Sequence, residues 1–67
     1  MFEIDNVKFK KARKKTKLNQ SAVATVIGKN GKDISHYETG RAKPPADSLL
    51  TFLIEFKINP LDIAKKV

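Results

Sequence analysis

Apolar residues recur along this chain at intervals of three and four positions, the spacing that places them on one face of an α-helix. Polar residues, glycine and proline interrupt the pattern often, so each helix must be short. The pattern predicts a first helix capped by Asp5 or Asn6 and running to about Thr16, a second over Gln20–Ile27, a third between Asn30 and Gly40, a fourth with Pro45 in its first turn, and a short fifth opened by Asn59-Pro60.

No strand pattern of any length competes with these helices. Met1–Ile4 is too short to classify, and Phe2 and Ile4 fit either a short strand or a cover for the core. The fold is therefore predicted to be all-α, with five helices in a single domain over residues 1–67.

The helical period also assigns a predicted core. A chain of this length buries only about 60% of the surface that its unfolded form exposes, so one compact core is possible and little space remains for an enclosed active site. The inward positions are Phe9 and Ala12 in the first helix, Val23, Ala24 and Ile27 in the second, Ile34, Tyr37 and Glu38 in the third, Leu49, Leu50, Phe52, Leu53 and Phe56 in the fourth, and Leu61, Ile63 and Ala64 in the fifth.

Residues 18–40 carry the most informative pattern, because two short helices are joined there by a tight turn. Gly28 can take the left-handed conformation that ends a helix without a Cβ penalty. Asn30, with Asp33 three residues on, fits a capping box at the start of the next helix. Small Ala24 lies in the middle of the first of these helices. This order of residue sizes is typical of a helix-turn-helix.

Charge is distributed unevenly along the chain. The net charge is +7, and eleven basic residues between Lys8 and Lys43 are opposed only by Asp33 and Glu38. A concentrated positive field attracts polyanions such as nucleic acid. The stretch Lys8–Lys17 taken alone fits a solvated helix face that keeps a small protein soluble equally well.

Several classes of function are excluded by composition. There is no cysteine, and His36 is the single histidine, so neither a disulfide framework nor a metal site is expected. The chain shows no nucleophile–base constellation and no phosphate-binding glycine loop, so we expect neither an enzyme nor a cofactor. The longest apolar run is too short to span a bilayer and no signal peptide is recognisable, so a soluble cytoplasmic protein without membrane partners is expected.

One set of residues, in register from Lys8 to about Ala64, connects the chain to a known family: Leu18-Asn19-Gln20, Ala24, Gly28, Ile34, Tyr37-Glu38, Gly40-Arg41 and Pro44. With these residues the chain resembles the lambda repressor/Cro-like helix-turn-helix DNA-binding domains, also called the XRE family. The resemblance implies that the third helix enters the major groove, that Gln20 lies at a phosphate, that Arg13 pairs with Glu38, and that the protein binds DNA as a dimer.

Three residues depart from the pattern of the family. Lys29 replaces a residue that is usually apolar and half-buried, and its aliphatic stem can cover that surface. Gly31 stands at the first exposed position of the reading helix, so one base-reading side chain is missing. Lys57 replaces the usual glycine in the turn before the fifth helix, where a side chain strains or alters the turn.

The position of each residue in the motif gives the candidate DNA contacts. Lys32, Ser35 and His36 are the expected base readers, although a phosphate contact suits Lys32 better than a base contact. Candidate contacts to the DNA backbone surround them: Asn19, Gln20, Lys29, Asn30, Arg41 and Lys43. For each of these residues the alternative is an ordinary exposed polar side chain. Asp33 is expected to cap the helix, and Tyr37 to anchor it in the core.

These observations predict a sequence-specific regulator of transcription that binds a double-stranded DNA operator as a homodimer. A Cro-like or prophage-type repressor that occludes a promoter fits best, while a restriction-modification controller and an antitoxin-type autoregulator remain open. Ile58, Leu61 and Ile63 are the expected dimer surface. The alternative function is a protein-interaction or antitoxin-type module on the same fold with weak base readout, which Gly31 favours.

Overall fold

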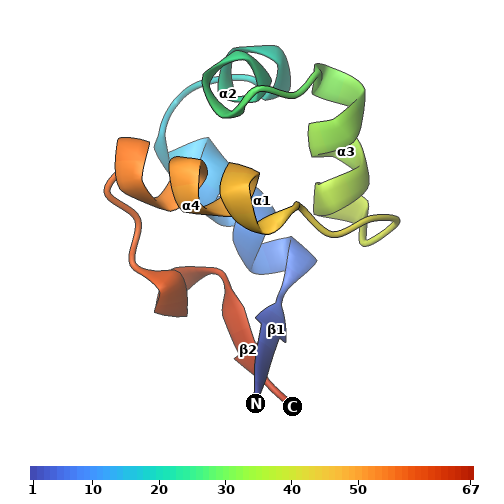
Figure 1. The fold of residues 1–67 in the computed structure, drawn as a ribbon, viewed down its shortest axis with the longest axis vertical. Helices are drawn as coiled ribbons and strands as arrows, with labels where there is room; N and C mark the ends of the chain where they lie inside the picture. The colour runs from blue at the N-terminus through green and yellow to red at the C-terminus, as the bar shows by residue number, and fades with distance from the viewer.

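The computed structural model describes all residues from 1 to 67 (Figure 1). Its elements, in chain order, are strand β1 (Phe2–Ile4), helices α1 (Asn6–Lys15), α2 (Gln20–Ile27), α3 (Gly31–Thr39) and α4 (Ala46–Glu55), the 3₁₀ turn η1 (Pro60–Asp62) and strand β2 (Ala64–Lys66). The first four predicted helices are present. No helix of the chain is both long and apolar enough to cross a membrane.

The predicted fifth helix is wrong, and so is the purely helical fold. Asn59 caps η1 as expected, because its side chain accepts a hydrogen bond of 2.9 Å from the Leu61 N–H, but only a single 3₁₀ turn follows. The chain then becomes extended, and β2 pairs antiparallel with β1, with Ile4 opposite Ala64. Figure 1 shows this two-stranded sheet projecting from the helical body with both termini at its end. The fold is therefore mostly helical, with four α-helices.

The core is built around Phe9 of α1. The Phe9 ring stacks on Phe52 of α4 with 4.7 Å between the ring centroids, and it meets Tyr37 of α3 edge to face at 6.1 Å. Such aromatic pairs contribute roughly 0.5–1.5 kcal/mol beyond the area that they bury. The core brings together all four helices and one residue from the C-terminal segment: Phe9, Ala12, Val23, Ala24, Ile27, Ile34, Tyr37, Phe52 and Ile63.

Two residues predicted to face the core, Leu50 and Leu61, are exposed instead. Leu50 lies on the outer side of α4 with 57% of its surface exposed, whereas Ser48 is buried. Ile63 is only 2% exposed, so it belongs to the core and is excluded from the expected dimer surface. Of the other two residues expected there, Leu61 is 64% exposed, and Ile58 is half-buried and packs against the core.

Two lysines adopt the left-handed conformation that favours glycine. Lys57 has φ 53°, as expected where it replaces the usual glycine before η1, and Lys17 has φ 63° in the turn between α1 and α2. Each costs roughly 1–2 kcal/mol relative to an unstrained backbone. Both conformations end a helix abruptly and turn the chain back onto the core, so the strain is stored in the turns that define the fold.

Candidate nucleic-acid interface

The turn between α2 and α3 forms as the sequence predicts. Gly28 takes φ 74°, and the Lys29 N–H donates to the Ala24 carbonyl at 2.8 Å, which closes the end of α2. Ala24 itself is 1% exposed and lies in the core beside residues of α3. Lys29 is half-buried, consistent with its stem covering the surface beneath it. The turn therefore fixes the angle at which α3 leaves α2.

A capping box begins α3. The Asp33 N–H donates to Asn30 Oδ1 at 2.9 Å, and the Asn30 N–H donates to Asp33 Oδ2 at 3.3 Å. The caps predicted at Asn30 and Asp33 are confirmed. Because its carboxylate is occupied in this way, Asp33 stabilises the positive end of the helix and is poorly placed to read a base.

The inner face of α3 is firmly anchored. Ile34 is fully buried, and Tyr37 and Glu38 are each about 5% exposed (5% and 6%). Burial also raises the pKa of the Tyr37 phenol above its ordinary value, with a smaller contribution from the charges of nearby carboxylates. An exposed stacking platform is excluded for Tyr37, as expected. The outer face of α3 is left open because its inner face is held by the core.

Glu38 is the centre of a buried charge cluster that ties three helices together. Arg13 of α1 donates to it through two nitrogens, Nε to Oε2 and Nη2 to Oε1, the latter at 3.3 Å. Gln20 of α2 adds a hydrogen bond from Nε2 to Oε1 at 3.0 Å, and Asn6 Nδ2 donates to the Glu38 carbonyl at 3.1 Å. The side chains of Arg13 and Glu38 are 11% and 2% exposed. The implied Arg13–Glu38 pair is therefore present and buried.

The loop after α3 is anchored at one carbonyl. Gly40 takes φ 82°, and the His36 carbonyl accepts hydrogen bonds from the Arg41 N–H at 2.9 Å and from the Ala42 N–H at 3.3 Å. Arg41 and Lys43 extend into solvent from this fixed loop. Two basic side chains are thus held beside the C-terminal end of α3.

Lys43 has an acidic neighbour across the molecule. Its Nζ lies 3.5 Å from Glu3 Oε2, and Lys65 Nζ lies 3.4 Å from the other oxygen of the same carboxylate. The positive charge of Lys43, and then the hydrogen bond from Lys65, hold the pKa of Glu3 below its ordinary value. All three side chains are partly exposed, so the pairs contribute little to stability.

Gly31 has a packing role that the sequence does not reveal. A Cβ atom built at Gly31 would lie 3.1 Å from the Ser21 side-chain oxygen and 3.7 Å from the Ser21 backbone nitrogen. A side chain at Gly31 would therefore displace the Ser21 hydroxyl, while the Ser21 backbone lies at an ordinary contact distance. Gly31 lies at the contact between the two helices and is only partly exposed.

The start of α2 carries further hydrogen-bond donors. The Asn19 side chain caps the helix by accepting from the Ala22 N–H at 2.8 Å. The backbone N–H groups of Gln20 and Ser21 have no acceptor within the protein. Two exposed residues are not among the predicted contacts: Ser21, beside Gly31, and Thr39, at the end of α3. The position of Ser21 directly after Asn19-Gln20 in the motif, and the helical period of α3 for Thr39, are the signals that would have indicated them.

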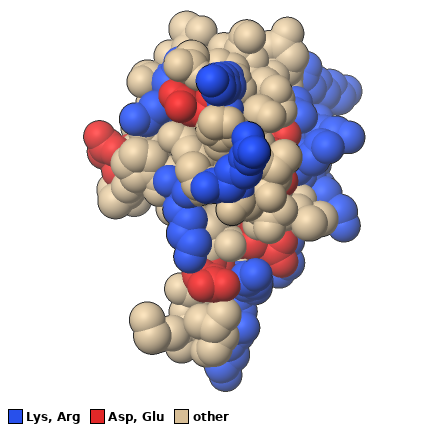
Figure 2. All heavy atoms as spheres, turned by 90° about the vertical axis from the view of Figure 1, so that its right-hand side faces the viewer, with Lys and Arg blue, Asp and Glu red and all other residues tan.

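The predicted contacts lie on α3 and in the segments directly before and after it. Figure 2 shows the face that carries α3, with lysine and arginine atoms across its centre and along one edge, and fewer acidic atoms. Lys32 is exposed in the first turn of α3, and Ser35 and His36 are half-exposed along it. The structure places the remaining candidates at the start of α2, in the following turn and in the loop after α3: Asn19 and Gln20, Lys29 and Asn30, and Arg41 and Lys43.

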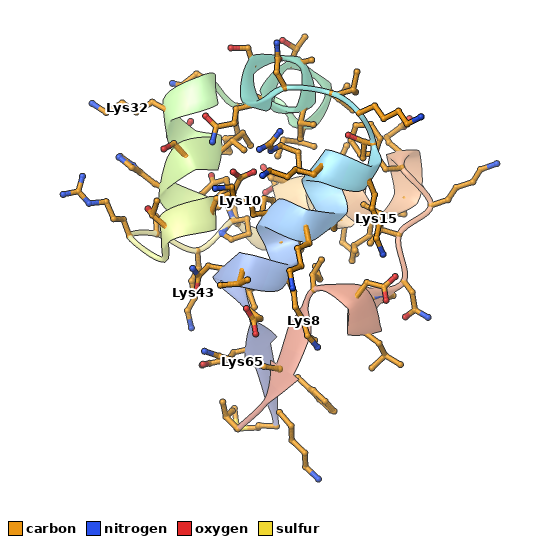
Figure 3. The ribbon with its side chains drawn as sticks, turned by 180° about the vertical axis from the view of Figure 1, so that it is seen from behind. Lys8, Lys10, Lys15, Lys32, Lys43 and Lys65 are labelled. Carbon is orange, nitrogen blue, oxygen red and sulfur yellow. The ribbon has the colours of Figure 1, made fainter.

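The lysines of α1 are spread around the exposed side of that helix. Successive helical residues are about 100° apart, so Lys10 falls nearest the flank of Arg13, which faces α3, and Lys14 falls almost opposite the buried Phe9. The other three lysines fall on the opposite flank: Lys8, Lys11 and Lys15. Figure 3 shows Lys10 between α1 and α3, with Lys15 on the far side. The basic cluster seen in the sequence therefore extends around the exposed side of α1, with Lys8, Lys11 and Lys15 on the part furthest from Arg13.

No group of three or more histidine, cysteine or acidic side chains is arranged to hold a metal ion.

Comparisons with known proteins identify the family of the chain. No significant match was found among curated proteins or among solved structures. A family model described as a helix-turn-helix domain matches residues 6–67, nearly the whole chain. The protein belongs to this family of helix-turn-helix domains, of the lambda repressor/Cro-like (XRE) type.

Proposed function

We propose that the protein is a sequence-specific regulator of transcription that binds double-stranded DNA, with α3 as the helix that reads the major groove. One observation carries the proposal: the inner face of α3 is held by the core and by the Glu38 cluster, while its outer face is open. A helix held so rigidly presents its outer side chains in fixed positions, which is what base recognition needs.

Reading of bases is assigned to three side chains of the open face. Lys32 reaches furthest from the first turn, and it suits guanine O6 and N7 or a phosphate. Ser35 and His36 lie one turn further along and can each donate or accept a hydrogen bond. Because Gly31 has no side chain, the start of α3 can approach the DNA closely. The shape of the DNA supplies the remaining discrimination between base sequences.

Contacts to the sugar-phosphate backbone are assigned to the two ends of this region. At the start of α2, the free N–H groups of Gln20 and Ser21 and the positive end of the helix favour a phosphate. The Gln20 side chain already donates one hydrogen bond to Glu38, so its backbone N–H is the better phosphate donor. The flanking side chains supply the remaining contacts: Asn19, Lys29, Asn30, Arg41 and Lys43.

We further propose that two copies bind a two-fold operator and repress by excluding polymerase from a promoter, as a Cro-like protein would. The longest dimension of the domain is 30 Å, and half-sites one helical turn apart are separated by about 34 Å. Two domains side by side therefore match adjacent half-sites. Exposed apolar side chains of α4 supply the candidate dimer surface, with Leu50 57% and Ile54 69% exposed.

The interaction-module alternative rests on Gly31, which has no side chain with which to read a base. Gly31 also lies close to Ser21 of α2, which gives the glycine a packing role but adds no base reader. Nothing else in the geometry favours a fold without base readout.

Selection from a library of random duplex DNA tests the proposal. The purified protein should enrich one two-fold sequence, and footprinting should show two half-sites about one helical turn apart. Competition binding at one fixed salt concentration should then favour the selected site over random duplex by at least about 10³-fold. Absence of enrichment would contradict sequence-specific binding, and a single unrepeated half-site bound by one monomer would contradict the dimer.

A further inference from the structure

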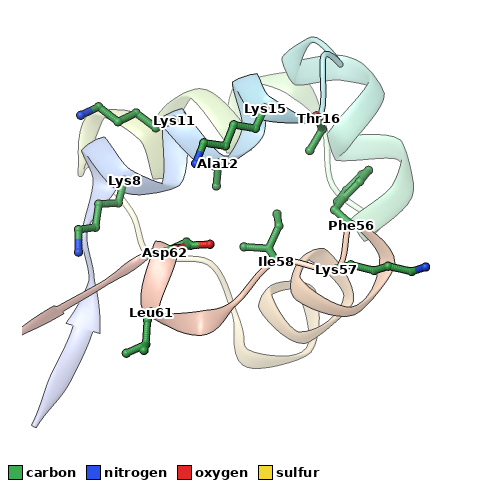
Figure 4. Close-up of a pocket in the computed structure, with 10 residues that line it drawn as sticks. All are labelled: Lys8, Lys11, Ala12, Lys15, Thr16, Phe56, Lys57, Ile58, Leu61 and Asp62. Carbon is green, nitrogen blue, oxygen red and sulfur yellow. The ribbon is translucent and has the colours of Figure 1, made fainter.

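A second basic region lies away from the open face of α3. A hollow of about 550 Å³ opens between α1 and the segment that follows α4, and Figure 4 shows the side chains that line it. Its rim carries four lysines, Lys8, Lys11 and Lys15 from α1 and Lys57 from the turn. Its apolar lining includes Phe56, Ile58 and Leu61. These seven residues define the lysine groove.

The charges of the lysine groove have no partners within the chain. None of its lysines forms an ion pair within 4.0 Å, and only Lys8 donates a hydrogen bond, to the Ala64 carbonyl at 2.9 Å. Asp62 is the one carboxylate in the lining, and it makes no ion pair either. Lys11 and Lys15 are four residues apart on a helix, a spacing at which like charges repel. Charge that repels within the protein is complementary to an acidic ligand.

The apolar lining narrows the chemistry of that ligand. Leu61 is 64% exposed although it borders a hollow, and Phe56 and Ile58 are only half-buried. A phosphate backbone would use the lysines and leave this apolar surface wet. A ligand with acidic groups on one side and aliphatic groups on the next would cover both parts of the groove.

We propose that the lysine groove binds an acidic amphipathic helix of a partner protein. Lys8, Lys11 and Lys15 span about 10 Å along α1. Carboxylates three and four residues apart on one stripe of a partner helix have the same spacing, and leucines on the neighbouring stripe would rest on Leu61 and Ile58. The groove lies on the flank of α1 opposite Arg13, so occupation leaves α3 open. The inference stands independently of the proposed DNA binding.

A designed peptide tests the groove directly. The probe is a fluorescein-labelled helical peptide with glutamates three and four residues apart and leucines on the adjacent stripe, and its control is the same composition in scrambled order. Fluorescence anisotropy with the full chain at fixed salt should show saturable binding of the probe, weaker by about tenfold for the scrambled peptide. Equal binding of the two peptides would overturn the proposal, because general charge attraction would then explain both.

Matched variants locate the site on one flank of α1. Lys11→Ala with Lys15→Ala should lower the affinity for the probe by about tenfold, while Lys10→Ala with Lys14→Ala, at positions that do not line the groove, should change it by less than about twofold. Leu61→Ser, which leaves all the lysines in place, should also weaken binding of the probe. Circular dichroism melts confirm that each variant is folded. Equal loss from the two lysine pairs, or no loss with Leu61→Ser, would overturn the proposal.

Two further measurements separate other occupants of the groove. Random duplex DNA should not displace the probe, and the Lys11→Ala, Lys15→Ala variant should retain its affinity for duplex DNA. If duplex DNA displaced the probe and bound this variant weakly, the groove would be a nucleic-acid surface and the proposal would fail. Sedimentation of the protein alone gives the second measurement. A dimer abolished by the same substitutions would show that the groove holds a second copy, which would also overturn it.

Discussion

The face of α3 and the lysine groove are both basic, yet they are built differently. Around α3, cationic side chains surround a helix that is capped at its start and fixed by a buried charge cluster at its end. In the groove, unpaired lysines border an open apolar lining. The first arrangement suits a ligand whose sequence is read by side chains held in fixed positions. The second suits a ligand that neutralises the lysines and covers the apolar surface between them. The comparison teaches that net charge indicates affinity for anions but does not identify which anion.

The largest expected effect concerns the support of the α3 face. Glu38→Ala removes a carboxylate that Arg13 and Gln20 both contact, and leaves the Arg13 charge nearly buried without its partner. Breaking a buried pair typically costs about 3–5 kcal/mol, so the free energy of unfolding should fall by about that amount in urea denaturation. Operator binding should be lost with it.

The control for this prediction is Glu3→Ala. Glu3 also pairs with two cations, but its side chain is 35% exposed and solvent screens both pairs, so its loss should cost much less than the loss of Glu38. A similar small cost for Glu38→Ala would contradict the view that the buried cluster holds α3. The groove lysines, which have no ion pairs to lose, should also be replaceable at little cost.

The next effect separates base readers from backbone contacts. Alanine at Lys32, Ser35 or His36 should cost the operator about 1–3 kcal/mol more than random duplex for each true base contact. Alanine at Arg41 or Lys43 should weaken both kinds of DNA about equally, because these side chains extend from the loop beyond the end of α3. Competition binding at a single salt concentration measures the difference. Altered sequence preference in the loop variants alone would show that α3 is not the reader.

A smaller effect appears in the salt dependence of DNA binding. If about five phosphates are neutralised, log K should fall with log salt at a slope of about −4 to −5, and Arg41→Ala should reduce the slope by about 0.9. Lys11→Ala with Lys15→Ala should leave the slope unchanged, because these lysines lie on the flank of α1 away from α3. A slope near zero for the native protein would contradict the view that basic side chains neutralise DNA phosphates. A reduced slope in the double variant would show that the groove lysines also contact DNA.

Local signals in the sequence predicted most of the helical scaffold. The caps at Asp5, Asn19 and Asn30 and the glycines at Gly28 and Gly40 act within a few residues of themselves, and the structure confirms each of them. The buried face of α3 followed from its helical period in the same way. Such features can be read from a sequence because their physical causes lie close together along the chain.

The remaining features depend on residues that are distant in the sequence. β1 and β2 are three residues each and pair across the two ends of the chain, so neither shows a period of its own. The burial of Ser48 and the exposure of Leu50 depend on how α4 rotates against the core. Likewise, the contact of Gly31 with Ser21 and the position of three α1 lysines beside the groove depend on the arrangement of neighbouring elements. The roles of the individual DNA contacts stay predictions for the binding experiments.

The smallest expected effect is a pH dependence set by Asp5, which caps α1, and by Glu3 of β1. The Asp5 carboxylate accepts the backbone N–H groups of Lys8 and Val7, which lowers its pKa, and Lys43 and then Lys65 lower the pKa of Glu3. Both folded-state values lie below the unfolded ones, so the unfolded chain takes up protons first as the solution is acidified. The stabilisation is therefore present above about pH 5 and is lost progressively below about pH 4. Thermal melts between pH 7 and pH 2 should show this decline.

Two substitutions separate the two carboxylates and relate them to the two basic regions. Asp5→Asn keeps a capping oxygen that does not titrate, so it should flatten the acid decline while changing stability at pH 7 only slightly. Glu3→Gln removes the acidic neighbour of Lys43, whose Nζ lies 3.5 Å from it, and should raise the affinity for duplex DNA at pH 7. The same substitution should leave binding of the acidic peptide to the lysine groove unchanged, because Glu3 pairs with no groove lysine. If Glu3→Gln strengthened peptide and DNA binding by the same factor, the two regions would share one electrostatic field, and their separation would be wrong.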